Sequence, residues 1–213
     1  MCGFTNAADI KTAVALGVDA IGLVFYPPSK RFVALERAIQ LAESIPFFVS
    51  TVALFVDQTE QQVKQVLNAM PVSLLQFHGN ESAAYCESFE RPYIKVVSVP
   101  VAGDEASLSA IQNSIYQQID AHPNARGFLL DSKLPTTPGG TGLTFDWRVI
   151  PNDLTRPVVL AGGLSPSNVK DAIDQVEPFA VDVSSGIESA PGRKDAALMA
   201  QFVEQVRAAN DRH

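Results

Sequence analysis

The 213-residue sequence predicts an α/β fold, a (β/α)8 TIM barrel formed by one domain over residues 1–213, and three observations support this prediction. Short apolar runs rich in Val, Ile, Leu and Phe recur along the chain. They are nearly continuous rather than alternating, as in strands covered on both faces of a parallel sheet. Amphipathic stretches with helical spacing separate them, and the β-then-α unit repeats about every 20–35 residues. A doubly wound open sheet is the alternative; it is less favoured because no G-x-G-x-x-G follows the first strand and the units number eight.

The individual elements follow from these runs and from the residues at their boundaries. The predicted strands are Ala20–Phe25, Val49–Val56, Ser73–Phe77, Tyr93–Val99, Gly127–Leu130, Pro157–Ala161 and Ala180–Val183. The predicted helices are Ala7–Leu16, Leu35–Ser44, Glu60–Ala69, Ser82–Phe89, Leu108–Ile119, Asn168–Val176 and Asp195–Ala208. Gly17 is a stop signal for the first helix. Thr59 and Gln62 are spaced as a capping box, and Ser165 before Pro166 is spaced as a capping hydroxyl before a first-turn proline.

The eighth strand has to precede Ala7, where Met1-Cys2-Gly3 is too short for a strand of ordinary length. We therefore expect the first strand to be truncated at the N-terminus. A barrel that lacks most of one strand leaves the neighbouring strand edges unpaired. We expect a version extended by a few residues to have a higher thermal midpoint.

Composition narrows the class of protein. Hydrophobic residues make up 46% and charged residues 18%, an ordinary globular balance. Sixteen Lys and Arg against 23 Asp and Glu give a net charge of −7 without a basic cluster, which argues against a nucleic-acid partner. The sequence has no signal-peptide pattern and no apolar run of about 20 residues, so we expect no membrane partner. The two cysteines, Cys2 and Cys86, lie far apart, and we expect reduced thiols in a cytoplasmic monomer.

Barrel proteins place binding and catalytic groups where the strands pass into the following loops. The residues at those points are more polar and richer in glycine than the strands before them. They are Cys2, Tyr26 to Arg31, Asp57, Gln76 to Gly79, Ser98, Asp131, Gly162 and Gly163, and Ser184 to Gly186.

The strongest of these signals comes from the loops that follow the last two strands. Leu160–Pro166 ends one strand and opens a helix, and Asp182–Glu188 ends the next. Glycine lets a backbone approach an anion closely, and free N–H groups at a helix start attract negative charge. We therefore expect phosphate to bind at Gly162, Gly163, Ser184, Ser185 and Gly186. The alternative is a pair of tight turns that simply need glycine.

An acid and a base are the next candidates. Asp131 directly follows the apolar strand Gly127–Leu130, and the glycine-rich segment Pro138–Gly142 has the composition of a loop that closes over a ligand. Burial under such a loop would favour a protonated carboxyl able to act as an acid; the alternative is an Asp turn. Cys2 could remove a proton if local positive charge lowered its pKa, or it could be a buried thiol that fills space. Spacing alone does not decide for Cys2.

Other polar residues at the same positions leave two interpretations open. Arg31, on a proline-stiffened loop, could grip a carboxylate with two hydrogen bonds or be an exposed cation. His78 could bind a ligand or end its strand, and Asp57 could cap a helix or touch a ligand. Asp182 could support a neighbouring group or belong to a structural polar layer. The sequence shows no metal-ligand spacing, P-loop or nucleophile elbow, so we expect no metal.

Motifs in order along nearly the whole chain resemble those of the phosphoribosylanthranilate isomerase family. They are Met1–Thr5, Phe25–Arg31, Gln76–Gly79, Leu130–Ser132, Gly139–Gly142, Phe145–Trp147, Leu160–Val169, Val181–Glu188 and Pro191–Asp195. The family's opening pattern, K-x-C-G-x-T, has several residues before it, whereas only Met1 precedes Cys2 here.

The resemblance implies an isomerase of tryptophan biosynthesis that carries out an Amadori rearrangement without a cofactor. N-(5′-phosphoribosyl)anthranilate would become 1-(2-carboxyphenylamino)-1-deoxyribulose 5-phosphate. It implies that Asp131, as general acid, protonates the ring oxygen while the ring opens to a Schiff base. Cys2, as general base, then removes the C2′ proton. Arg31 would hold the anthranilate carboxylate, His78 would contact substrate, and the two glycine loops would hold the phosphate.

Two alternatives remain at this stage. The first is the related sugar-phosphate isomerase of histidine synthesis, which resembles this sequence at the phosphate loops but has Asp at the position of Cys2. The second is a barrel that binds sugar phosphates or a partner protein without catalysis. The second leaves the joint presence of Cys2 and Asp131 unexplained.

Overall fold

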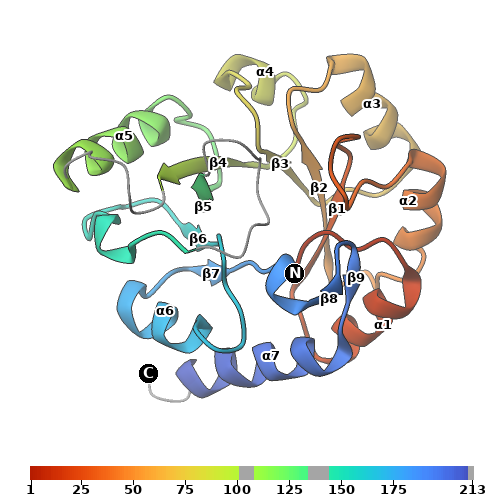
Figure 1. Cartoon of the computed structure of the whole chain (residues 1–213). Helices are drawn as coiled ribbons and strands as arrows, with labels where there is room; N and C mark the ends of the chain where they lie inside the picture. The colour runs from red at the N-terminus through yellow and green to blue at the C-terminus, as the bar shows by residue number, and fades with distance from the viewer. Residues whose placement is uncertain (101–107, 134–143, 211–213) are drawn as a thin grey trace.

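A single parallel sheet forms the centre of the computed structural model, which describes residues 1–100, 108–133 and 144–210. Its strands are β1 (Ala20–Val24), β2 (Ser50–Phe55), β3 (Leu74–Phe77), β4 (Tyr93–Pro100), β5 (Gly127–Lys133), β6 (Val158–Leu160) and β7 (Ala180–Val181). Each strand pairs in parallel with the next one along the chain. Figure 1 shows the sheet curving around a central axis. This is the architecture of a (β/α)8 barrel, which confirms the predicted fold class.

Helices surround the sheet on its outer side (Figure 1). They are α1 (Ala7–Ala15), α2 (Leu35–Ala42), α3 (Glu60–Ala69), α4 (Ala83–Glu87), α5 (Leu108–Asp120), α6 (Val169–Val176) and α7 (Ala196–Asn210), with short 3-10 turns η1 (Trp147–Val149) and η2 (Ser185–Ile187). Their apolar faces and the outward side chains of the strands form one large core, in which Phe4, Phe55, Phe77 and Phe128 are almost completely buried. No helix within the described ranges has both the length and the hydropathy to cross a bilayer.

The N-terminal residues occupy the remaining strand position. Cys2 forms an isolated parallel bridge with Gly22 of β1, and its backbone N–H donates to the carbonyl of Val183, just after β7, at 3.0 Å. Gly22 donates to the carbonyl of Met1 at 2.9 Å, and Gly3 donates to that of Gly22 at 2.9 Å. This short segment therefore joins the two edges of the sheet and fixes Cys2 between the first and last strands. At the position of the predicted truncated strand, the structure therefore has one isolated β-bridge, Cys2 with Gly22, and the backbone hydrogen bonds beside it.

The local signals at Thr59 and Gly17 predict their helix boundaries correctly. Thr59 and Gln62 form the full capping box of α3, and Gly17, with φ of 84°, follows the end of α1. The capping role expected of Ser165 is wrong. Residues 165–168 form a turn closed by Asn168, whose Oδ1 accepts from the Ser165 N–H at 2.8 Å, and α6 begins only at Val169.

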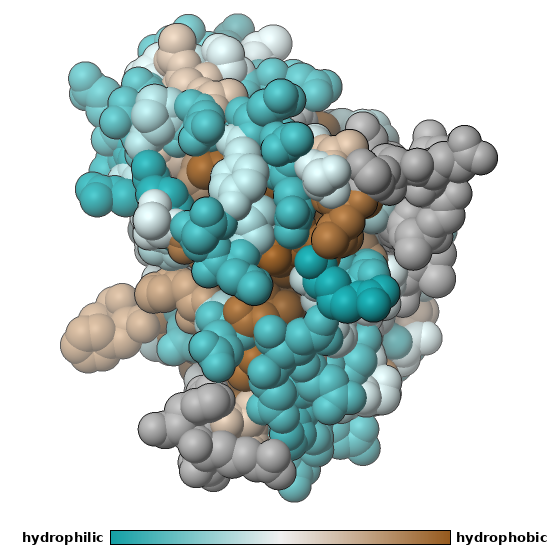
Figure 2. Space-filling view, turned by 90° about the vertical axis from the view of Figure 1, so that its left-hand side faces the viewer, coloured by the Kyte–Doolittle hydropathy of each residue, from teal (hydrophilic) through white to brown (hydrophobic). Residues whose placement is uncertain are grey.

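Two features of the second half of the chain differ from the prediction. β5 continues past Leu130 to Lys133, so Asp131 lies within the strand, opposite Ser98 of β4, rather than after it. An antiparallel pair, β8 (Glu188–Ala190) and β9 (Arg193–Lys194), follows η2 and was not expected. Between β5 and β6 the described residues contain only the turn η1. Figure 2 shows the face that lies on the left in Figure 1. The surface of this face is mostly hydrophilic, with hydrophobic atoms in the recesses between the elements.

Candidate active site

A cavity of about 530 Å³ opens at the carboxyl ends of the strands. Apolar side chains of the barrel interior line part of it, among them Val24, Leu54, Leu129 and Ala161. Polar groups around them include Cys2, Tyr26, Arg31, Gln76, His78, Asp131, Gly162, Gly163, Asp182, Ser184 and Ser185. Of the residues expected to be catalytic or to bind substrate, only Gly186 does not line the cavity, and of the other strand-end candidates Asp57, Gly79 and Ser98 do not line it either. A mostly apolar pocket of this size with a few convergent polar groups is typical of small-molecule sites.

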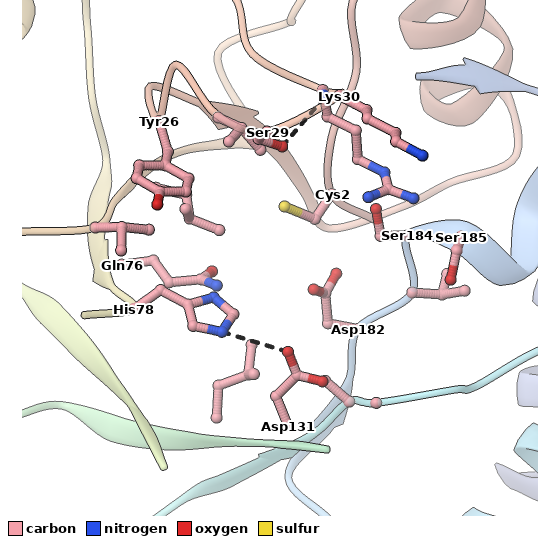
Figure 3. A pocket seen from close by; sticks show the side chains of 18 of the residues that line it. Cys2, Tyr26, Ser29, Lys30, Gln76, His78, Asp131, Asp182, Ser184 and Ser185 are labelled. Atoms are coloured by element: carbon pink, nitrogen blue, oxygen red, sulfur yellow. Dashed lines mark hydrogen bonds and ion pairs between the residues drawn. The ribbon is translucent and has the colours of Figure 1, made fainter. Parts of the chain in front are cut away.

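Asp131 and His78 meet on one side of this cavity. The Nε2 atom of His78 lies 3.4 Å from Oδ2 of Asp131, and both side chains are partly buried (Figure 3). Gly162 keeps the Asp131 carboxylate accessible: a β-carbon at Gly162, where φ is +77°, would lie 3.0 Å from Oδ1 of Asp131 and 2.5 Å from the backbone nitrogen of Ser132. Asp131 therefore presents a carboxylate that a histidine orients and that no side chain covers from position 162.

The His78 loop is held by a buried ion pair. Lys95 of β4 lies 3.2 Å from Glu81, and its ammonium also donates to the carbonyl of Gly79 at 2.6 Å. Glu81 accepts the N–H of Gly79 at 2.9 Å and that of Asp57 at 2.8 Å. The Asp57 carboxylate accepts the N–H of Asn80 at 2.6 Å. Asp57 therefore neither caps α3 nor lines the cavity; it fixes the loop that carries His78.

Cys2 points into the cavity from the opposite side (Figure 3). Burial is the largest influence on its thiol and, together with the negative charge of Asp182, raises its pKa from 9.0 to about 12, although Lys194, the N-terminal ammonium and Arg31 oppose this shift. The net shift is therefore opposite to the lowered pKa that a role as base requires. Gly22 makes room for the side chain, because a β-carbon there would lie 2.6 Å from Sγ of Cys2.

Arg31 belongs to a cluster of charges that sequence reasoning did not find. Its Nε and Nη2 donate to the two carboxylate oxygens of Glu188 at 2.8 and 2.7 Å. Lys194 donates to the same carboxylate at 2.8 Å and to the carbonyl of Ser184 at 2.9 Å. Burial raises the pKa of Glu188, but Arg31 and Lys194 lower it by more, so the net shift of this pKa is downward. The one available signal was that Glu188 and Lys194 both belong to motifs of the family resemblance.

The two glycine loops lie beside this cluster. Gly162 and Gly163 have φ of 77° and 68°, the left-handed conformation that glycine adopts without strain. The carbonyl of Gly163 accepts from Nδ2 of Asn168 at 3.0 Å, which fixes this loop to the start of α6. Ser184 and Ser185, on the loop after β7 (Figure 3), line the same cavity as these glycines. The segment Pro138–Gly142, expected to close over a ligand, lies outside the described residues.

These features define a (β/α)8-barrel protein with a ligand-sized cavity at the carboxyl ends of its strands, mostly apolar with a few convergent polar groups. The sequence profile described as "N-(5'phosphoribosyl)anthranilate (PRA) isomerase" matches residues 1–205. The chain belongs to this family of isomerases.

Curated relatives and solved structures agree with this assignment. An N-(5'-phosphoribosyl)anthranilate isomerase of Pseudomonas fluorescens is 46% identical over 99% of this chain and 96% of its own. One of Legionella pneumophila is 46% identical over 97% and 95%. The crystal structure of the Thermotoga maritima enzyme superposes with a TM-score of 0.85 at 35% identity and covers 98% of this chain and 97% of its own. Another phosphoribosyl anthranilate isomerase structure, in complex with reduced 1-(o-carboxyphenylamino)-1-deoxyribulose 5-phosphate, has a TM-score of 0.82 at 34% identity, with 97% and 96% covered.

Proposed function

We propose that this chain converts N-(5′-phosphoribosyl)anthranilate into 1-(2-carboxyphenylamino)-1-deoxyribulose 5-phosphate, an Amadori rearrangement in tryptophan biosynthesis. The observation that carries the proposal is that Cys2 and Asp131 enter one cavity from opposite sides. A solved relative holds a reduced form of this product. Aldose-to-ketose rearrangement needs an acid at the ring oxygen and a base at C2′, and two such groups in one cavity meet that need.

Phosphate binding is assigned in this proposal to Gly162, Gly163, Ser184, Ser185 and Gly186. Loops after the last two strands of such barrels commonly bind phosphate through backbone N–H groups. Left-handed glycines in the first loop and the serines that line the cavity from the second support this assignment.

The anthranilate carboxylate would bind Arg31. Glu188 accepts from Nε and Nη2 of the guanidinium, and within the described ranges Nη1 has no such partner and could donate to a ligand. A fixed, planar guanidinium is well suited to a carboxylate because its donors match the two oxygens.

Asp131 is the proposed acid and His78 the group that orients it. In its protonated form Asp131 would give its proton to the furanose ring oxygen. The C1′–O bond then breaks, and the nitrogen lone pair forms the C1′=N bond of a cationic Schiff base. His78, 3.4 Å from Asp131, limits the positions of the carboxyl.

Cys2 is the proposed base. It takes the proton from C2′, and the electrons of that C–H bond form the C1′=C2′ bond while the nitrogen regains its lone pair. The resulting enolamine gains a proton at C1′ and loses the one on its C2′ hydroxyl to give the ketone. The positive charge of the Schiff base favours the thiolate, which offsets the burial that disfavours it in the free protein.

Turnover of the named substrate tests the proposal. N-(5′-phosphoribosyl)anthranilate is made in situ from anthranilate and phosphoribosyl pyrophosphate, and loss of its fluorescence is followed after the chain is added. We expect loss at a rate proportional to the concentration of chain. A folded chain that leaves the fluorescence unchanged, but isomerises the sugar phosphate of histidine synthesis, would overturn it.

We also propose that the chain works in the cytoplasm and as a monomer. The exposed pair Phe47 and Phe48 favours the alternative, a dimer, because the two side chains are 90% and 91% exposed with ring centroids 4.4 Å apart. Exposed apolar pairs are common in subunit contacts, and a Thermotoga maritima relative is described as dimeric. Sedimentation as a 22.9 kDa species would support the monomer, and sedimentation at twice that mass would overturn it.

A further inference from the structure

We propose that Lys194 is a positioning residue that joins the two anion-binding regions of the site. It holds Arg31 through Glu188 and holds the Ser184–Gly186 loop through a backbone carbonyl. This inference rests on the function proposed above, because it treats Arg31 as the carboxylate group's partner and the loop as the phosphate's. Lys194 does not line the cavity and does not touch the reacting atoms.

The contacts of the Lys194 ammonium carry the argument. Its side chain has no exposed surface, and Nζ lies 2.8 Å from Oε1 of Glu188 and 2.9 Å from the carbonyl oxygen of Ser184. The same Oε1 accepts from Nε of Arg31 at 2.8 Å. The buried ammonium and the Arg31 guanidinium therefore share one acceptor atom, Oε1 of Glu188. The ammonium also donates directly to the first residue of the Ser184–Gly186 loop.

The fold leaves this ammonium little freedom. Glu188 and Lys194 are paired residues in the β8–β9 register, and the backbone N–H of Lys194 donates to the Asp9 carboxylate at 2.9 Å. The ammonium also lies 5.5 Å from the ring centroid of Phe4. These contacts hold the Lys194 ammonium in one position, so it can fix the positions of Glu188 and the Ser184 carbonyl.

The charges of the cluster give Lys194 a second effect. Without it, Glu188 would cancel the charge of Arg31, and the pair would offer no net charge to a carboxylate. With it, the three side chains of Arg31, Glu188 and Lys194 carry a net charge of +1. Charge has a larger effect here than at the surface because the local dielectric is lower.

The proposal predicts a particular pattern of ligand affinities. Replacing Lys194 by Met should weaken the binding of both inorganic phosphate and anthranilate by about tenfold or more, the size expected when bonds to a charged group are lost. Arg31→Met should weaken anthranilate alone. A residue that merely stabilised the fold would not produce this difference.

Direct binding measurements test the pattern independently of turnover. Inorganic phosphate is titrated by phosphorus NMR and anthranilate by its fluorescence, with wild type, Lys194→Met, Arg31→Met and Lys64→Met. Lys64 is the matched control, since it pairs with Glu60 on the exposed surface of α3. Absence of turnover in wild type would overturn the proposed function but not the coupling. A folded Lys194→Met that keeps either ligand within about twofold of wild type would overturn the coupling.

Glu188→Gln keeps the test decisive if Lys194→Met does not fold. It removes the negative charge with little change in shape and leaves the Lys194 bond to Ser184 available. The amide cannot accept both Arg31 donors, and this loss of positioning opposes the gain of positive charge. We expect the loss of positioning to dominate, so that anthranilate binds at least about fivefold more weakly while phosphate stays within about twofold. Unchanged anthranilate affinity in this variant would overturn the proposal.

Discussion

A β-carbon on Gly186 would lie 1.9 Å from the backbone carbonyl oxygen of Leu164. The loop after β7 and the loop after β6 are therefore in direct backbone contact, and no side chain fits between them. This contact fixes the separation of the two loops to which phosphate binding is assigned.

Replacing Gly186 by Ala should push these loops apart and raise KM for the phosphorylated substrate by about tenfold, because phosphate donors would lose their geometry. Gly17→Ala is the matched control, since Gly17 has φ of +84° and lies far from the cavity lining. The control should cost roughly 1–2 kcal/mol of folding free energy and leave KM unchanged. Steady-state kinetics and chemical denaturation check both. A wild-type KM in Gly186→Ala would contradict the assignment.

The pH dependence of turnover should respond to Asp182. Its charge, after burial, is the second influence that raises the pKa of Cys2. If the Cys2 thiolate is the base, kcat/KM rises with pH as the thiol ionises, and removing the Asp182 charge lowers that pKa. Asp182→Asn should therefore shift the ascending limb of the kcat/KM profile to lower pH. Asp153→Asn, at an exposed pair with Tyr116, should not shift it. Superimposable limbs in wild type and Asp182→Asn would exclude this electrostatic role.

Folding stability should fall in alkaline solution. Burial raises the pKa of Cys86, which is fully buried, from 9.0 to about 12, so its unfolded thiol ionises first. The stabilisation is complete below pH 9 and is lost as pH rises towards 12, by at most about 1.4 kcal/mol per pH unit for one group. Urea unfolding at pH 8 and pH 10 should show a smaller loss for Cys86→Ala than for wild type. An equal loss in both would show that Cys86 contributes nothing.

Breaking the ion pair beneath His78 should be costly. The side chains of Lys95 and Glu81 are 7% and 2% exposed, so Lys95→Met leaves a buried carboxylate without its cation. Such a loss costs about 3–5 kcal/mol, whereas Lys64→Met at an exposed pair should cost at most about 1 kcal/mol. Thermal and urea unfolding of the two variants measure the difference. Comparable small losses would mean that the Lys95 ion pair does not support the loop.

The sequence predicts the barrel well because its strands are buried on both faces. Each of the seven apolar runs overlaps one strand of the sheet, with ends displaced by three residues at most. Boundaries with a local signal are most accurate, as at Thr59, where the capping box sets the start of α3. The start of α6 was predicted to within one residue, but the capping role of Ser165 was wrong because the Asn168 side chain closes a turn that Ser165 and Pro166 do not reveal.

The candidate site was only partly predictable. Strand ends identify residues that share one rim, and of those expected to be catalytic or to bind substrate all but Gly186 line the cavity, whereas the strand-end candidates Asp57, Gly79 and Ser98 do not. Glu188 and Lys194 were missed because β8 and β9 are very short strands without an alternating pattern. The raised pKa of Cys2 depends on burial and on Asp182, which lies 180 residues away in the chain and close only in the folded barrel.

The division of acid and base between Asp131 and Cys2 is the central claim, and kcat for wild type, Cys2→Ser and Asp131→Asn tests it most directly. Cys86→Ala serves as the control for loss of a buried thiol, and circular dichroism establishes that each variant is folded. The account predicts a fall of about a hundredfold or more in kcat for each of the two variants, with the control close to wild type. A folded Cys2→Ser or Asp131→Asn with kcat near that of wild type would contradict it.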